Sequence, residues 1–283
     1  MTDCKTAIMK ARAVPGSDQL VSQVRDIAER YGSVVADLVS EETIPTGLDR
    51  LIVIGGDGTI IGAARQALGH GTPILGVNAG RLGILADFDA ESLARHADMI
   101  FGSTPLVREH LVLDIRILGA DGTPRFESVA INDCVVTAGP PYRMIELSLM
   151  IDDTAGPSIN GDGLIISTPI GSTAYNVSAG GPIIQPNVDA LVISAVAPHS
   201  LAFRPIVAAS DTRIHIGVKR GNEGTSLVLD GQATHRFSEG EHLVVKSHEK
   251  RAQLIGNPES SYWNTLIEKM RWGAPPTYRD RGT

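Results

Sequence analysis

The stretch Leu51–Thr59, read L-I-V-I-G-G-D-G-T, decides the fold of the N-terminal part of the chain. Its first four residues are apolar and three of them are β-branched, which is typical of a short buried strand. From Thr59 to Leu68, apolar residues recur at helical spacing. The stretch therefore predicts a strand, a glycine turn and a helix start. It is neither the dinucleotide fingerprint, since Ile61 replaces the third glycine, nor a P-loop, since no Gly-Lys-Ser or Gly-Lys-Thr occurs.

Such a turn can bind an anion, because a helix N-terminus carries unpaired N–H groups and the positive end of the helix dipole. We expect the backbone N–H groups of Gly55, Gly56, Gly58 and Thr59 to hold phosphate oxygens. Asp57 does not fit a simple phosphate cradle, because its carboxylate repels phosphate unless it accepts a proton or binds a metal ion. The alternative interpretation is that Asp57 is a solvated turn residue.

Composition limits the partners of the protein. The length of 283 residues suits one large or two ordinary domains. A net charge of −7 and the lack of a Lys/Arg run argue against nucleic acid and anionic membrane as partners. Two cysteines are too few for a disulfide framework or a zinc site. No stretch has the length of a signal segment or a membrane span, so we expect a cytoplasmic enzyme.

The first part of the chain alternates strands with helices. Strands are predicted at 6–13, 33–39, 51–54 and 73–77, and helices at 17–32, 59–68 and 91–101. This alternation predicts an α/β domain over residues 1–105 with a parallel sheet, whose ligands bind at the carboxyl ends of the strands. Asp57 and Asn78 both lie at such ends.

Beyond residue 105 the pattern changes to the period-two alternation of strands. Ile145, Leu147 and Leu149 share one face of a predicted strand, and Asp121-Gly122 separates two strand-like runs as a hairpin turn does. We therefore predict a mostly antiparallel β domain over residues 106–255. Residues 256–283 are predicted to form a C-terminal helix and a tail that packs back on the N-terminal domain.

A second glycine-rich stretch, Asn160–Pro186, contains many small and hydroxyl residues and few large ones. An irregular surface loop is one interpretation, but Leu164, Ile165 and Ile166 would anchor it. Its closely spaced N–H and hydroxyl groups suit a polar ligand with ribose or amide groups. Asp162 could accept a hydrogen bond from such a ligand, or it could be a turn residue.

Asn132 and Asp133 form a polar pair inside an apolar run predicted as one strand over residues 129–136. Adjacent strand residues point to opposite faces, so one of the two should face inward and need a partner. A bulge or a solvent-facing edge is the alternative.

Together these stretches resemble the NAD kinase family. G-G-D-G-T looks like its first motif, Asn132-Asp133 like its Asn-Glu/Asp pair, and Asp162–Pro182 like its most diagnostic segment. The run N-x-G-x-L-G-x-L from Asn78, P-H-S-L from residue 198, R-P-I-V from residue 204 and D-G-Q from residue 230 also match, in the same order. G-G-D-G-T alone is shared with lipid kinases and, more loosely, with phosphofructokinases; the long second segment separates them.

The resemblance implies an N-terminal α/β domain, a C-terminal β-sandwich and a site between them. It also implies a homodimer or homotetramer in which a neighbouring subunit completes the NAD site. The expected reaction moves the γ-phosphoryl group of ATP, or of polyphosphate, to the 2′-hydroxyl of NAD's adenosine ribose. Asp57 is expected to be the general base. Mg²⁺ or Mn²⁺ would arrive with ATP, with no dedicated metal site in the protein.

The resemblance further implies NAD contacts from Asp57, Gly58, Asn132, Asp133, Arg143, Asn160, Asp162, Ile170, Thr173, Ala174, Tyr175, Asn176, Val177, Ser178 and Gln232. Arg143 would reach a phosphate from an adjoining subunit, or else be an exposed strand residue. The chain departs from the family pattern at Ile170, where Thr is common, and at Asp133, which is shorter than the commoner Glu.

Two other functions remain open from the sequence. A lipid kinase could share G-G-D-G-T but would need an apolar groove for an acyl chain. A non-catalytic NAD(H)-sensing module would bind the dinucleotide without transferring phosphate.

Overall fold

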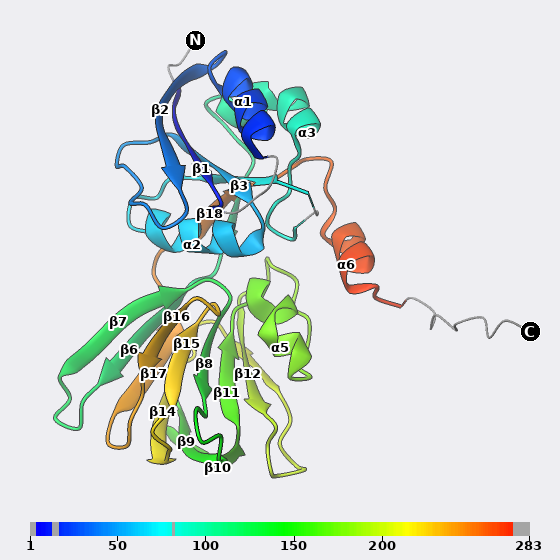
Figure 1. Ribbon diagram of the computed structural model, residues 1–283. Coiled ribbons are helices and arrows are strands. Elements are labelled where there is room, and N and C mark those ends of the chain that lie inside the picture. Colours follow the sequence, from blue (N-terminus) through cyan, green and yellow to red (C-terminus); the bar gives the residue numbers. More distant parts are fainter. Residues whose placement is uncertain (1–3, 13–16, 81–82, 274–283) are drawn as a thin grey trace, which may run out of the picture.

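The computed structural model describes residues 4–12, 17–80 and 83–273. An α/β part lies above a β-sandwich, and helix α2 lies where the two parts meet (Figure 1). This confirms the predicted fold class of a parallel-sheet α/β domain followed by antiparallel β-structure. None of the described helices combines the length and the apolar character needed to cross a membrane.

The α/β part is built on a sheet with the strand order β2-β1-β3-β4-β18-β5. Neighbouring strands run parallel from β2 to β18, and β5 pairs antiparallel with β18. The elements are β1 (Cys4–Lys10), α1 (Ser17–Ala28), β2 (Gly32–Val39), β3 (Arg50–Gly55), α2 (Asp57–Ala67), β4 (Ile74–Asn78), α3 (Ala90–Arg95), α4 (Ala97–Phe101), β5 (Val107–His110) and β18 (Ala252–Ile255).

Helices cover both faces of this sheet. Apolar residues of α1, α3 and α4 pack with Ile52, Ile54 and Leu75 on one face. On the other face, α2 packs with Leu51 and Val53. The prediction of a single helix over 91–101 is wrong: at His96 the backbone turns to φ −107° and ψ 13°, which ends α3 and separates it from α4.

The β-sandwich consists of two antiparallel sheets with the strand orders β10-β9-β14-β17-β6-β7 and β13-β12-β11-β8-β15-β16. The inner faces share one apolar core that includes Ile115, Ile166 and Ile216. Its strands are β6 (Leu113–Leu118), β7 (Pro124–Ala130), β8 (Asp133–Thr137), β9 (Ile145–Ile151), β10 (Thr154–Gly161), β11 (Gly163–Ser167), β12 (Ala190–Val196), β13 (Ile206–Ala209), β14 (Ile214–Arg220), β15 (Ser226–Leu229), β16 (Ala233–Arg236) and β17 (His242–Ser247). Asp121-Gly122 forms the β6–β7 hairpin turn, with Gly122 at φ 77°.

The expectation of one strand over 129–136 is also wrong. β7 ends at Ala130 and β8 begins at Asp133, and the two strands belong to different sheets. The polar pair Asn132-Asp133 thus lies where the chain crosses from one sheet to the other. A turn of this kind, rather than a bulge within one strand, accounts for polar residues in an apolar run.

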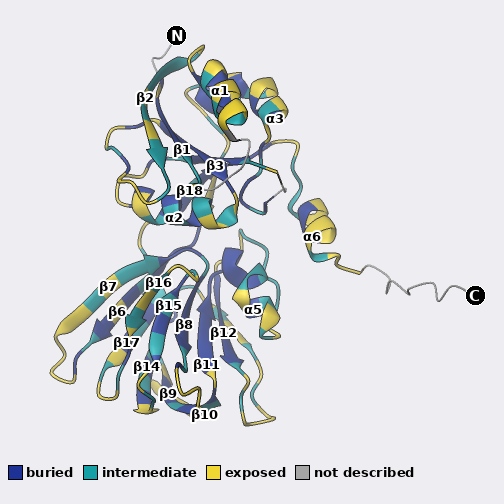
Figure 2. Ribbon diagram, viewed as in Figure 1, coloured by how far each residue is buried: buried dark blue, intermediate teal, exposed yellow. Residues whose placement is uncertain are grey.

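The α/β sheet includes two strands that flank the sandwich in sequence. β5 and β18, at the two ends of the range 106–255, complete the α/β sheet, while the strands of the antiparallel sheets span 113–247. Ile131 and Ile170 pack in the same apolar cluster as α2, so the junction has a continuous core. In both parts the central strands are largely buried, whereas edge strands such as β2 and β7 are partly exposed (Figure 2).

Helix α6 (Tyr262–Met270) projects beside the junction (Figure 1). Its Lys269 lies near Asp57 of the α/β part, and the Tyr262 hydroxyl donates to the backbone oxygen of Ile184 in the second part. The predicted tail beyond residue 273 lies outside the described residues.

Candidate functional site

Asp57 is the first residue of α2, and its carboxylate is held by the loop after β4. Oδ1 accepts hydrogen bonds from the N–H groups of Leu85 at 3.0 Å and Ala86 at 3.3 Å, and Oδ2 from Ile84 at 3.0 Å. A Cβ atom on Gly83 would lie 2.0 Å from Oδ1, so only glycine permits this approach. Lys269 Nζ lies 3.7 Å from Oδ2. The side chain stays one-third exposed, so a ligand can reach it.

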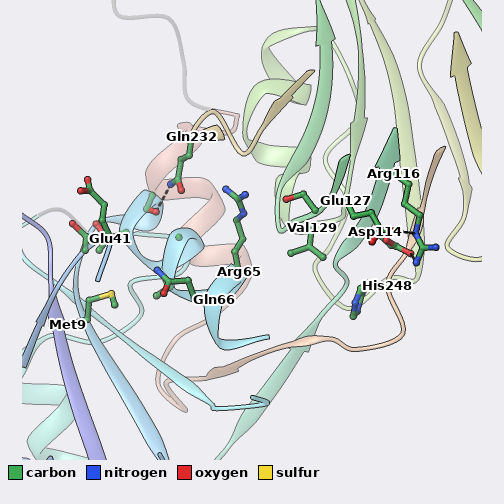
Figure 3. A pocket seen from close by; sticks show the side chains of 16 residues that line it. Met9, Glu41, Arg65, Gln66, Asp114, Arg116, Glu127, Val129, Gln232 and His248 are labelled. Carbon is green, nitrogen blue, oxygen red and sulfur yellow. Dashed lines mark hydrogen bonds and ion pairs between the residues drawn. The ribbon is translucent and has the colours of Figure 1, made fainter. Parts of the chain in front are cut away.

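The D-G-Q motif forms the tip of the β15–β16 hairpin and contacts α2. Gln232 Nε2 donates a 2.6 Å hydrogen bond to the backbone oxygen of Gly58 (Figure 3). Arg65 Nε, on the same helix, lies 3.7 Å from Asp230 Oδ2. The hairpin tip therefore ties the sandwich to the helix that begins with Asp57.

Asp230 also holds the Asn132-Asp133 turn. Its carboxylate accepts from the N–H groups of Ile131, Asn132 and Asp133, with a shortest distance of 2.7 Å, to Asn132. Burial raises the pKa of Asp230, whereas the three N–H donors and Arg65 act in the opposite direction. Because charge-assisted hydrogen bonds are the strong ones, this side chain fixes the turn.

Asp133 is the inward member of the polar pair, with 4 % of its surface exposed, and Asn132 is partly exposed. Burial, and then the charge of Asp230, raise the pKa of Asp133 to about 7, although the backbone N–H of Tyr175 donates a hydrogen bond to it. The expected inward carboxylate therefore exists. It connects the turn to the second glycine-rich stretch.

Much of that stretch bonds to itself and to the Asn132 turn. Thr168 Oγ1 donates to the backbone oxygen of Ile131, and the Thr168 N–H donates to that of Asn132. Ser172 and Asn176 are fully buried and hydrogen-bonded within the stretch. These polar residues build the loop, which explains why a run with few large side chains is ordered.

What remains partly open begins at Thr173, the last residue of the 3₁₀ turn η1 (Ile170–Thr173), and continues through the short helix α5 (Tyr175–Ser178). Thr173, Ala174 and Val177 are partly exposed, and Tyr175 and Ser178 are exposed. Ile170 is 5 % exposed and lies in the apolar cluster of α2, and the Asn176 amide is fully used inside the protein. Neither of these two side chains offers a free polar group to a ligand.

Three predicted contacts lie elsewhere. Ser167 pairs with Asp133 and Gly163 with Thr137, so Asp162 lies beyond the opposite end of β11, at least about 13 Å from Asp133 at about 3.3 Å per residue. Asn160 lies beside it in β10. Arg143 is exposed in the turn before β9. The fold of one chain does not bring these residues to Asp57.

A cleft of about 1010 Å³ opens beside α2, between this helix and strands β6 and β7. The predicted residues Gly58, Thr59 and Gln232 line it. Arg65 projects from α2 on one side, and Arg116 and Glu127 lie on the other (Figure 3). The volume suffices for a nucleotide-sized ligand. Gly55, by contrast, is buried in β3.

Sequence reasoning missed the residues that hold the site together. Asp230, Arg65 and Lys269 were not expected to contribute, and neither were the N–H groups of residues 84–86. D-G-Q was noted as a motif, but nothing in the sequence places its aspartate on the Asn132 turn. Among the described residues, no group of three or more His, Cys, Asp or Glu side chains is placed to bind a metal ion.

Comparisons with known proteins agree with this architecture. Residues 17–103 match the family model of the ATP-NAD kinase N-terminal domain, and residues 131–256 match that of the C-terminal domain. An NAD kinase of Rhodopirellula baltica is 38% identical over 226 residues, covering 80% of this chain and 72% of that protein. An NAD kinase of Wolinella succinogenes is 33% identical over 280 residues, covering 95% and 96%.

Two solved structures share the fold. The crystal structure of yeast NADH kinase complexed with NADH has a TM-score of 0.81 at 20% identity, covering 98% of this chain and 89% of that chain. An NAD kinase from Archaeoglobus fulgidus in complex with ATP has a TM-score of 0.74 at 24% identity, covering 94% and 98%.

The fold and the site thus define a kinase with an α/β domain, a β-sandwich and a glycine-turn carboxylate at their junction. The chain belongs to the NAD kinase family.

The close approach of the glycine-rich stretch to the Asn132 turn can be tested at Gly171. A Cβ atom there would lie 2.0 Å from the backbone oxygen of Asn132. We expect Gly171→Ala to lower the free energy of unfolding by about 1–3 kcal/mol, measured by urea denaturation. The matched control is Gly69→Ala, whose Cβ would have no atom within 4 Å and should change stability by about 0.5 kcal/mol or less. Equal effects of the two variants would contradict the close approach.

The buried Asp133 carboxylate should make stability depend on pH. Its pKa rises from 3.8 to about 7 on folding, so the unfolded chain loses this proton first and stability falls between these values as pH rises. Asp133→Asn removes that loss. We expect the Tm advantage of the variant to grow from pH 4 to pH 7 and to level off above, measured by circular dichroism.

The control for this experiment is Asp211→Asn, since Asp211 is exposed. A Tm difference for Asp133→Asn that stays constant from pH 4 to pH 8 would show that the carboxylate is not destabilised by folding.

Proposed function

We propose that the protein transfers the γ-phosphoryl group of ATP to the 2′-hydroxyl of the adenosine ribose of NAD, with Asp57 as the general base. Membership of the NAD kinase family and the position of Asp57 at the domain junction support this proposal. The relatives in complex with NADH and with ATP support the two substrates. Polyphosphate is the alternative donor. A cytoplasmic location stays a prediction.

The hydrogen bonds of Asp57 leave one position for the substrate. A carboxylate has about four lone-pair sites. Leu85 and Ala86 use two on Oδ1, and Ile84 uses one on Oδ2. Oδ2 therefore keeps a site from which it can accept the proton of the ribose hydroxyl. Because the three N–H donors fix the carboxylate, no reorientation is needed before the proton moves.

Phosphoryl transfer otherwise depends on positioning and on neutralising charge. The first N–H groups of α2, at Asp57 and Gly58, would hold phosphate oxygens, whereas that of Thr59 already donates to the backbone oxygen of Gly56 at 3.0 Å. Lys269 adds a positive charge near Oδ2. Mg²⁺ or Mn²⁺ bound to the nucleotide would supply further neutralisation. Such an ion would be held mainly by phosphates, because three lone-pair sites of Asp57 accept from backbone N–H groups and the fourth faces the ribose hydroxyl in this proposal.

The NAD site would extend from Asp57 over the Asn132-Asp133 turn to the exposed strip Thr173–Ser178, with Gln232 at the other end. Asn160, Asp162 and Arg143 lie too far away to join it within one chain. We propose that a homodimer or homotetramer brings these residues to the site of a neighbouring subunit. Their position at the outer end of the sandwich supports this arrangement.

Neither alternative from the sequence is favoured. Both domains match NAD kinase models, and the relatives described above are NAD kinases. The same assay can exclude both alternatives. With ATP, Mg²⁺ and the purified protein, a lipid kinase would phosphorylate diacylglycerol, and a sensing module would bind NAD without forming NADP.

The single most direct test is Asp57→Asn. We expect this variant to fold and bind NAD while its kcat falls by roughly 10²–10⁴, because the amide cannot accept the hydroxyl proton. NADP formation is followed with a coupled dehydrogenase, and folding by circular dichroism. The control is Asp26→Asn on the exposed face of α1, which should keep its activity. Turnover within a factor of about ten of wild type would exclude Asp57 as the base.

Shared sites can be tested by mixing defective subunits. If Asp162 serves a neighbour's site, Asp162→Ala and Asp57→Asn should each be inactive alone, while co-expressed subunits regain activity in mixed oligomers. Light scattering should give a mass two or four times that of the chain. A monomeric active enzyme, or no recovery in verified mixed oligomers, would contradict the shared site.

A further inference from the structure

A second cavity, of about 350 Å³, lies behind the loop that holds Asp57. It is enclosed by this loop, by the ends of β5 and β18, by residues 185–187 and by α6. Among the predicted NAD contacts, only Ile170 lines it, and the exposed strip Thr173–Ser178 does not. The cavity is therefore separate from the surface that the proposed function assigns to NAD.

The walls combine apolar surface with a few polar groups. Leu85, Ile170 and Leu254 form apolar walls, and Gln185, Tyr262 and His110 add hydrogen-bonding groups. Arg108 and Asp87 also line the cavity, and they pair with each other at 3.3 Å. A volume of this size and such a lining suit one compact aromatic molecule rather than an extended nucleotide.

His110 supplies an independent sign of a ligand. The residue is 8 % exposed, and its Nδ1 atom has no hydrogen-bond partner among the described residues. Burial, and then the charges of Arg108 and Arg251, lower the pKa of His110 to about 4, so the ring is neutral and has one nitrogen free to accept. An unpaired buried polar atom costs about 1–3 kcal/mol. In this ring orientation Nδ1 is buried. Rotation of the imidazole by a half-turn about the Cβ–Cγ bond would exchange the positions of Nδ1 and Cδ2.

The cavity touches both elements that hold the Asp57 carboxylate. Ile84 and Leu85 line it, and their N–H groups bond to Asp57. Tyr262 and Thr265 line it from α6, the helix that brings Lys269 to Asp57. A molecule in the cavity would therefore contact the loop and the helix that position the base.

We propose that this cavity is a regulatory site for a small, uncharged aromatic heterocycle. The N–H or O–H group of this ligand donates a hydrogen bond to a ring nitrogen of His110. The bound ligand packs against Ile84 and Leu85 and stabilises the loop after β4. The hydrogen bonds from this loop to Asp57 are thereby fixed. The regulatory part rests on the proposed role of Asp57, whereas binding to the cavity does not.

Indole is a suitable probe, because it has one N–H donor and an otherwise apolar ring; 1-methylindole, which lacks the donor, is the matched ligand control. Binding is measured by ligand-observed NMR on the full chain, with and without saturating NAD. We expect indole to bind in both conditions, about tenfold more tightly than 1-methylindole, for one hydrogen bond of roughly 1.4 kcal/mol.

Two variants locate the binding. Leu254→Phe fills the cavity and should abolish indole binding, while Val35→Phe adds the same ring on the exposed face of β2 and should not. His110→Phe should make indole and 1-methylindole bind equally. If either cavity variant fails to fold, the comparison of the two ligands on the wild-type protein still decides the role of the donor.

The coupling between the cavity and the loop that holds Asp57 is measured by hydrogen exchange of the Ile84, Leu85 and Ala86 amides. This measurement does not require catalysis. We expect indole to slow their exchange by about fivefold, the lower end of typical coupling between sites. The site is overturned if indole does not bind, if NAD displaces it, or if Leu254→Phe still binds it. The regulation is overturned if indole binds without changing this exchange. Failure of NADP formation alone would contradict the proposed function and leave these binding results intact.

Discussion

The junction between the two domains depends on the buried carboxylate of Asp230. It accepts three consecutive backbone N–H groups of the Asn132 turn and lies beside Arg65 of α2. Each hydrogen bond to a charged group contributes about 1.5–3 kcal/mol, and removal of the carboxylate would leave buried donors unpaired. One side chain thus fixes the turn that carries Asp133 and couples it to the helix that begins with Asp57.

The same device occurs again at Asp57. There the N–H groups of residues 84–86 converge on a carboxylate, as those of residues 131–133 converge on Asp230. Residues 84–86 and 131–132 lie outside regular strands and helices, and Asp133 only begins β8, so these donors need other partners. The two aspartates accept these hydrogen bonds, which in turn fix the orientation of both carboxylates. One of them is buried and holds structure, while the other is partly exposed and faces the junction.

The glycine-rich stretch 160–186 shows that a polar sequence can serve packing as much as binding. Gly171 and Gly181 permit close approach to Asn132 and Asn176, and Ser172 and Asn176 bond internally. The remaining exposed strip is short. Its position against Asp133 follows from these internal contacts, so mutation of a buried hydroxyl residue here would disturb the site without touching a ligand.

Local pattern determined the succession of strands and helices in this protein. Apolar runs ended by glycine place β3, the turn and α2 within a residue or two, because hydrophobic periodicity and glycine flexibility act over a few residues. The change to period-two alternation likewise marks the sandwich. Motifs such as G-G-D-G-T and the pair Asn132-Asp133 could be singled out, because polar residues at apolar strand ends are visible in the sequence.

Only the tertiary structure decided how distant segments meet. The pairing of β18 with β4 and with β5 depends on residues more than a hundred positions apart, and no local pattern encodes it. The same holds for Asp230 on the Asn132 turn and for Lys269 beside Asp57. These contacts form because buried donors and charges must find partners once the two cores have packed, and that requirement exists only in the folded chain.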